Sequence, residues 1–227
     1  MTRTTNARVA GFTFLFYIAL GIAAMVVSGR TGNAAGIAAQ LAGIAQHASA
    51  VRLAAVLNLI TGFAALVLAV TLYAVTRDED PDLAMLALTC RVAEGVIGGI
   101  AIQRSLGLLW LATAAGANGA GTEASRVLGE FLMGQRWSFV IGAMFFAVGS
   151  TLFCWLLLRG RMIPIALAWL GVLASVLLVV LLPLQIMDVL PDPMIQFMWL
   201  PMAAFEIPLG LWLIIKGVAV PARALKR

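Results

Sequence analysis

Long apolar runs, each near the length that crosses a bilayer, alternate with short polar segments along this chain of 227 residues. A membrane-spanning helix needs about 20 mostly apolar residues to cross about 30 Å of hydrocarbon. Six runs in the sequence meet this requirement. The predicted spans cover residues 9–28, 52–76, 82–115, 137–158, 162–190 and 194–220. A Gly/Ala-rich loop is predicted between the first two spans, and the third is long enough that it must tilt or project.

The length of the apolar runs indicates helices rather than strands. Lipid offers no hydrogen-bond partner, so a backbone inside hydrocarbon must bond within its own segment or within a closed barrel. The alternating pattern of barrel strands is not seen in the sequence. We therefore predict an all-α fold, a polytopic transmembrane helix bundle that forms a single integral membrane domain over residues 1–227.

One shorter amphipathic segment is predicted beside the six spans. A helix from about Thr122 to Gln135 would place its apolar residues toward one side and would leave Arg126 and Glu130 exposed. The apolar residues are Leu128, Phe131 and Leu132. This pattern suits a short helix that lies in the membrane interface.

The composition supports a membrane protein and excludes a water-soluble domain. Hydrophobic residues make up 63% of the chain, charged residues 11%, and the mean hydropathy is +1.03. The net charge of +5 does not indicate nucleic-acid binding, because no basic stripe is interleaved with exposed aromatic residues. We expect the lipid bilayer to be the main partner, joined by a membrane protein partner or by a second copy of this chain.

The basic residues outside the spans predict an orientation, because cytoplasmic loops carry an excess of Lys and Arg. Nine positive residues fall on the side of the two termini and four on the other side. The nine are Arg3, Arg8, Arg77, Arg159, Arg161, Lys216, Arg223, Lys226 and Arg227. The four are Arg30, Arg52, Arg126 and Arg136, and Arg91 and Arg104 are left out because they fall within the third span. Both termini are therefore predicted to be cytoplasmic, in a multi-pass protein of the cell membrane.

Short sequence pieces spread over nearly the whole chain carry a resemblance. They are Arg8-Val9-Ala10-Gly11, Leu72-Tyr73, Arg91-Val92-Ala93-Glu94, Leu158-Arg159-Gly160-Arg161-Met162-Ile163-Pro164, Glu206, and the run from Leu209 to Gly217. With these pieces the chain resembles the bacterial domain-of-unknown-function family numbered 4386, a set of multi-pass membrane proteins. The resemblance implies a bacterial cytoplasmic membrane protein with six helices. It implies no activity and no catalytic residue.

Ionisable residues at membrane depth are costly unless they are paired or hydrated, so they indicate structural or functional sites. Arg91 and Glu94 are three residues apart in the third span and therefore share one face of its helix. Gly95 and Gly98 continue that face, and small residues let a neighbouring helix approach closely. A rise of about 1.5 Å per residue places Glu94 and Glu206 near mid-depth from opposite sides. The sequence thus predicts that these charged residues meet inside the bundle.

Two interpretations of this charged group stay open. Buried ion pairs can fix a helix arrangement, so the group can be a polar clasp. Alternatively, Pro201 and Pro208 bracket Glu206 and interrupt the last helix, a device of transporters that would make Glu206 a candidate proton carrier. Asn58 and Gln185 would then extend a polar route, although both residue types also join helices without a pathway.

Metal binding has only weak support in the sequence. Met194, Met198 and Met202 recur every four residues. Thioethers bind Cu(I), but Met also fills irregular helix contacts, so these three are weak candidates and no metal site is predicted. His47 is the single histidine, and Cys90 and Cys154 form no CxxC pair.

No motif for a hydrolase nucleophile, a P-loop or a dinucleotide fold is found, so no catalytic residue and no cofactor is predicted and an enzyme is disfavoured. Our first hypothesis is a structural or accessory membrane component that binds a lipid or protein partner. The alternative is a small proton-coupled transporter or permease that uses Glu206 and the Arg91/Glu94 pair.

Overall fold

The computed structural model describes residues 1–29, 36–118, 123–134 and 137–220. These residues form nine helices, and no strand occurs among them. The prediction of an all-α fold is confirmed. Six helical stretches in the described residues are long and apolar enough to cross a membrane, which indicates a multi-pass membrane protein.

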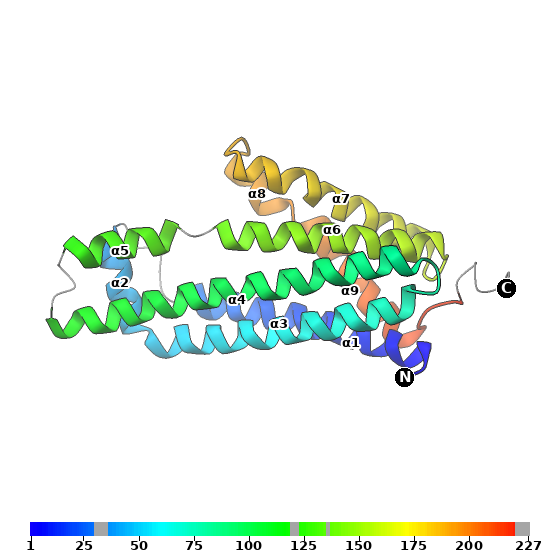
Figure 1. Ribbon diagram of the computed structural model, residues 1–227, viewed down its shortest axis with the longest axis horizontal. Coiled ribbons are helices and arrows are strands. Elements are labelled where there is room, and N and C mark those ends of the chain that lie inside the picture. Colours follow the sequence, from blue (N-terminus) through cyan, green and yellow to red (C-terminus); the bar gives the residue numbers. More distant parts are fainter. Residues whose placement is uncertain (30–35, 119–122, 135–136, 221–227) are drawn as a thin grey trace. The chain divides into compact units, whose positions relative to one another are not determined.

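The helices follow one another as labelled in Figure 1. The longer ones are α1 (Arg3–Ser28), α3 (Ala48–Thr76), α4 (Pro81–Asn118), α6 (Trp137–Arg159), α7 (Ile165–Ile186) and α9 (Leu200–Ile215). The shorter ones are α2 (Ile37–Gln46), α5 (Glu123–Gly134) and α8 (Asp192–Phe197). Thr122 and Gln135, the predicted ends of the short amphipathic helix, lie outside the described residues.

Besides shifts of a few residues at several helix ends, two features differ from the sequence prediction. Part of the predicted Gly/Ala-rich loop is α2, whose residues Ile37, Leu41 and Ile44 recur at helical spacing and pack inward. The predicted sixth span is interrupted, because α8 ends at Phe197 and α9 begins at Leu200. Pro201 stands in the first turn of α9, where a missing backbone N–H costs no intrahelical bond.

The packing divides the chain into two compact units. Unit 1 consists of residues 1–17, 63–95 and 140–227, and unit 2 of residues 18–62 and 96–139. The long helices α1, α3 and α4 contribute residues to both units. The single membrane domain of the sequence analysis stays a prediction.

Glycines bring the helices of unit 1 close together. At the contact of α1 with α9, a Cβ on Gly11 would lie 2.5 Å from the carbonyl oxygen of Gly210. Helix α7 packs along α9, and a Cβ on Gly171 would lie 2.5 Å from the ring of Phe205. A larger side chain at either glycine would therefore push two helices apart.

Charged residues join the chain segments at one end of unit 1. Arg3 donates a hydrogen bond of 2.6 Å to the carbonyl oxygen of Val75, near the C-terminus of α3. Arg159, the last residue of α6, forms ion pairs of 3.2 Å with Glu79 and Asp80 in the α3–α4 turn. The backbone N–H of Ala219, after α9, bonds to the carbonyl oxygen of Met162, after α6. The start of α1 and the ends of α3, α6 and α9 therefore meet at this end.

Unit 2 holds a small apolar core between α2, α5 and the later part of α4. Its buried residues are Leu41, Leu108, Leu111 and Ala112. Gly129 of α5 packs on α2, because a Cβ there would lie 3.1 Å from Cγ1 of Ile37. We call α2, α5 and residues 104–114 of α4 the short-helix module.

Candidate functional site

Arg91 is the centre of a buried polar cluster in unit 1. It lies on α4, and only 2% of its side chain is exposed. Gly149 of α6 makes room for this side chain, because a Cβ at Gly149 would lie 3.1 Å from Cγ of Arg91. The neighbouring helix can therefore approach a long, charged residue without displacing it.

Glu94 pairs with Arg91, as the sequence spacing predicts. Nη1 of Arg91 lies 2.8 Å from Oε2 of Glu94, one helical turn further along α4. The geometry at these two atoms is not that of a directed hydrogen bond, so the pair is held by charge. Tyr17 of α1 donates a hydrogen bond of 3.3 Å to Oε1 of the same carboxylate. The pair on α4 is thus tied to α1.

Two aromatic rings flank the Arg91 guanidinium. Its central carbon lies 4.6 Å from the ring centroid of Phe146 on α6 and 6.0 Å from that of Tyr17. Cation–π contacts of this kind are worth about 0.5–2 kcal/mol, with the upper end in desolvated sites. The rings replace part of the hydration that Arg91 loses on burial.

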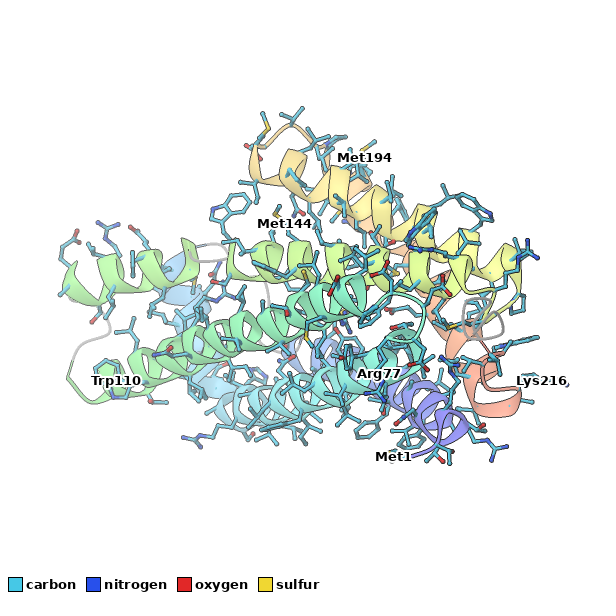
Figure 2. All side chains as sticks on the ribbon, turned by 45° about the vertical axis from the view of Figure 1, so that its right-hand side comes forward. Met1, Arg77, Trp110, Met144, Met194 and Lys216 are labelled. Carbon is cyan, nitrogen blue, oxygen red and sulfur yellow. The ribbon has the colours of Figure 1, made fainter. Side chains whose placement is uncertain are left out.

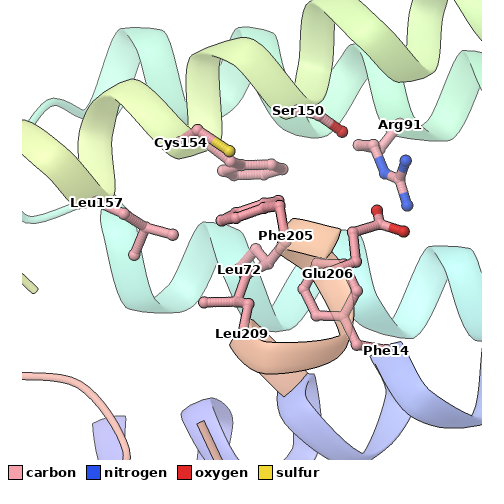
Figure 3. A pocket seen from close by; sticks show the side chains of 10 residues that line it. Phe14, Leu72, Arg91, Ser150, Cys154, Leu157, Phe205, Glu206 and Leu209 are labelled. Atoms are coloured by element: carbon pink, nitrogen blue, oxygen red, sulfur yellow. The ribbon is translucent and has the colours of Figure 1, made fainter. Parts of the chain in front are cut away.

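Glu206 faces the same guanidinium from α9. Figure 3 shows the carboxylate of Glu206 and the guanidinium of Arg91 turned toward one another. Glu206 is 7% exposed. In the described part of the chain, no hydrogen bond and no ion pair within 4 Å joins its carboxylate to another side chain. Glu206 is therefore attracted to Arg91 at longer range but has no partner in direct contact.

Arg91 and Glu206 both line a small cavity. Residues of α1, α3, α4, α6 and α9 line it, among them Ser150, Cys154 and Phe205. Its volume is about 10 Å³, which is room for about one water molecule. A space of this size can hold a hydrogen-bonded bridge between Arg91 and Glu206, but no larger substrate.

The charges of the cluster do not balance. Arg91 contributes one positive charge, and Glu94 and Glu206 contribute two carboxyl groups. Because Glu94 already contacts Arg91, Glu206 is the carboxyl group in excess. The cluster can hold helices together by charge, and Glu206 is the group on which a proton could be exchanged.

The other predicted polar residues do not join this cluster. Asn58 is exposed on α3 and belongs to unit 2. Gln185 lies near the end of α7, where its Oε1 is buried without a hydrogen-bond partner among the described residues. Neither residue lines the cavity. A polar route that runs through them has no support in this geometry.

The predicted methionine stripe is divided between two environments. Met194 belongs to α8 and is exposed, whereas Met198 and Met202 are buried. The described residues also contain no group of three or more His, Cys, Asp or Glu side chains that could hold a metal ion. The methionines stay weak candidates.

Sequence reasoning missed the aromatic and small members of the site. Tyr17, Phe146 and Cys154 stand in apolar runs where aromatic and small residues are ordinary, and nothing in their spacing indicates a charged neighbour. The helix interruption also lies away from Glu206. Only Pro208 stands inside α9, so the loss of a helix bond is limited to one position near the carboxylate.

A model of the family described as Domain of unknown function (DUF4386) matches residues 9–217. No curated protein and no solved structure matches the chain.

Proposed function

The chain belongs to the DUF4386 family, whose description gives no activity, and from the geometry of the site we propose that the chain is an accessory membrane component that binds a lipid or protein partner. In this proposal the cluster of Tyr17, Arg91, Glu94 and Glu206 is a polar clasp that holds the helices of unit 1 in one arrangement. The rest of the chain then presents surfaces to the bilayer or to a partner.

The observation that carries the proposal is the way Arg91 is buried. Its guanidinium contacts the carboxylate of Glu94 and lies near two aromatic rings. The positive charge is therefore compensated within the protein. The adjoining cavity has room for about one water molecule. A matched charge beside so small a space supports a structural role more than the passage of a solute.

The clasp is tested by its effect on stability. Removing one partner of a buried ion pair typically costs about 3–5 kcal/mol, because the other charge stays buried and unmatched. Arg91→Met and Glu94→Gln should therefore lower the melting temperature of the purified protein in detergent. The matched control is Arg126→Gln, which removes the exposed ion pairs of α5. Equal melting temperatures for all four proteins would refute the clasp.

A second candidate function is a small proton-coupled transporter, and the excess carboxyl group of Glu206 favours it. Intramembrane carboxylates without a matched cation occur in the proton relays of pumps and transporters. This function predicts proton flux in proteoliposomes that Glu206→Gln abolishes. The accessory function predicts no difference in flux between the two proteins.

For the location, we propose a multi-pass protein of the bacterial cytoplasmic membrane with both termini in the cytoplasm. The support is that the segments bearing Arg3, Arg77, Arg159 and Arg161 meet at one end of unit 1, together with the segment after α9. An excess of basic residues is typical of the cytoplasmic side. A C-terminal fusion to green fluorescent protein should fluoresce, and a fusion to alkaline phosphatase should be inactive. An active phosphatase fusion together with a dark fluorescent-protein fusion would show that the C-terminus lies outside the cytoplasm.

A further inference from the structure

Arg104 of α4 is a second arginine inside the predicted third span. It is partly buried, and its Nε atom is buried without a hydrogen-bond partner among the described residues. In the described part of the chain Arg104 forms no ion pair, in contrast to Arg91 and Arg126. A buried donor that lacks an acceptor costs about 1–3 kcal/mol, and more when it is charged. The described residues therefore provide no acceptor for this guanidinium, and its terminal nitrogens can take one from outside the chain.

Arg104 is the first residue of α4 in the short-helix module. Leu108 and Leu111 follow it by four and seven residues, so the three side chains share one face of α4. Both leucines belong to the apolar core that α2 and α5 cover. Arg104 therefore lies on the core-bearing face, one turn before that core begins.

The distance along α4 places Arg104 near a membrane surface. Pro81 begins the helix beside the charged α3–α4 turn, and Arg104 follows 23 residues later. At about 1.5 Å per residue this is about 35 Å, slightly more than the hydrocarbon thickness of about 30 Å. If the charged turn lies at one surface, Arg104 reaches the phosphate level of the opposite leaflet.

Exposed apolar side chains indicate that the short-helix module itself contacts lipid. Val127, Leu128 and Phe131 stay exposed on one strip of α5, although Gly129 and Met133 of the same helix pack inward. Trp110 projects from α4 with 65% of its surface exposed (Figure 2). Tryptophan is enriched at membrane–water interfaces. These residues lie within two turns of Arg104 on α4, or on the helix that covers that part of α4.

We propose that a phospholipid binds unit 2 at the Arg104 end of the short-helix module, with its phosphate oxygens accepting hydrogen bonds from the Arg104 guanidinium. A guanidinium presents its donors as a planar fork that matches two phosphate oxygens. The phosphate would then bind the terminal nitrogens of Arg104, for which the described residues provide no acceptor. The acyl chains then run along residues 96–103 of α4, which precede Arg104 in unit 2. This inference gives the lipid partner of the proposed accessory function a defined site, and it rests on that function.

The test measures lipid retention by the full chain. Wild type and variants are delipidated in detergent, and phosphatidylglycerol, phosphate-free galactosyl diacylglycerol or inorganic phosphate is added to each. Native mass spectrometry counts the bound lipid, and melting curves report the stabilisation. Phosphatidylglycerol should bind wild type and raise its melting temperature, whereas the galactolipid and inorganic phosphate should not.

Three variants separate the site from general effects. Arg104→Gln should weaken phosphatidylglycerol binding about tenfold or more, since it removes charge-assisted hydrogen bonds. Arg104→Lys keeps the charge but loses the fork, so it should bind more weakly than wild type and more tightly than Arg104→Gln. Arg126→Gln is the matched control, because that guanidinium already contacts Glu123 and Glu130, and it should bind like wild type.

Two outcomes overturn the proposal. Equal retention of phosphatidylglycerol by wild type and Arg104→Gln excludes the site, and equal stabilisation by inorganic phosphate excludes a lipid as the source of the phosphate. Melting curves without lipid show whether each variant is folded, and Arg104→Lys provides the test if Arg104→Gln is not. The polar clasp of the proposed function is tested by the melting temperatures of the Arg91 and Glu94 variants. A result that refutes the clasp is therefore distinguishable from a result that refutes this lipid site.

Discussion

Gly149 of α6 and Arg91 of α4 are in close contact, and a Cβ added to the glycine would lie 3.1 Å from Cγ of the arginine. The same added atom would lie 3.2 Å from the carbonyl oxygen of Ala87 and from Cβ of Cys90. Backbone atoms of α4 are thus part of the contact, and they cannot rotate away. The absence of a side chain on α6 is therefore a condition for burying the charge on α4.

Gly149→Val should destabilise the protein, because three helix atoms already lie at the contact limit. Overpacking of this kind costs about 1–3 kcal/mol. Thermal melting in detergent measures the loss. Gly98→Ala is the control, since a Cβ at Gly98 meets nothing within 4 Å and alanine favours a helix over glycine. If Gly149→Val melts like wild type, the close approach of α6 to Arg91 is wrong.

Substitutions in the polar clasp should lower the free energy of unfolding by different amounts. Arg91→Met leaves two carboxyl groups without their cation and should be the most destabilising, by about 3–5 kcal/mol. Glu94→Gln should come next, and Tyr17→Phe should cost about 1 kcal/mol for one lost hydrogen bond. Titration with SDS in mixed micelles gives the free energies of unfolding. A Tyr17→Phe loss as large as that of Arg91→Met would contradict this order.

Glu206→Gln should destabilise less than Glu94→Gln, because Glu206 has no hydrogen bond or ion pair with another side chain in the described part of the chain. The variant keeps the shape of the side chain and removes only its longer-range attraction to Arg91. Wild type and Glu206→Gln are also compared for proton flux in liposomes, with a pH-sensitive dye inside the vesicles. We expect equal proton leak. Flux in wild type that the variant abolishes at unchanged stability would favour the transporter instead.

Neither cysteine should react with a maleimide in the folded protein. Cys154 is 3% exposed beside the cavity, and Cys90 is 8% exposed on α4. Because a thiol must be reached by the reagent in its thiolate form, buried cysteines are inert. Mass spectrometry should find no label on the native protein and two labels after unfolding in SDS. Rapid labelling of Cys154 alone would show that the cavity opens to solvent.

The helices and the Arg91/Glu94 pair could be predicted because both depend on local spacing. Apolar runs of spanning length dictate helices in lipid, and residues three apart on a helix share a face whatever surrounds them. Helix α2 was missed because its small, apolar residues do not differ in type from a loop rich in Gly and Ala. Its periodic Ile37, Leu41 and Ile44 carry the signal, but only ten residues support it.

Other contacts of the polar cluster could not be predicted from the local sequence. The hydrogen bond from Tyr17 to Glu94 joins residues 77 positions apart in the chain, and nothing in either local sequence specifies the other. The sequence predicts that Glu206 meets the charges of α4, yet it does not show that Arg91 contacts Glu94 and leaves Glu206 without an ion pair among the described residues. That distinction depends on distances of a few ångströms between helices.

By itself, the sequence determined an all-α chain with six stretches that can cross a membrane, a charged group at depth and an asymmetry of basic residues. These follow from composition and periodicity, which act within one segment. Only the tertiary structure decided which glycines admit Arg91, which carboxylate pairs with it, and that Arg104 has no acceptor among the described residues beside the core of unit 2. Such facts depend on contacts between distant segments, where close packing lets a shift of one methyl group change the partner of a charge.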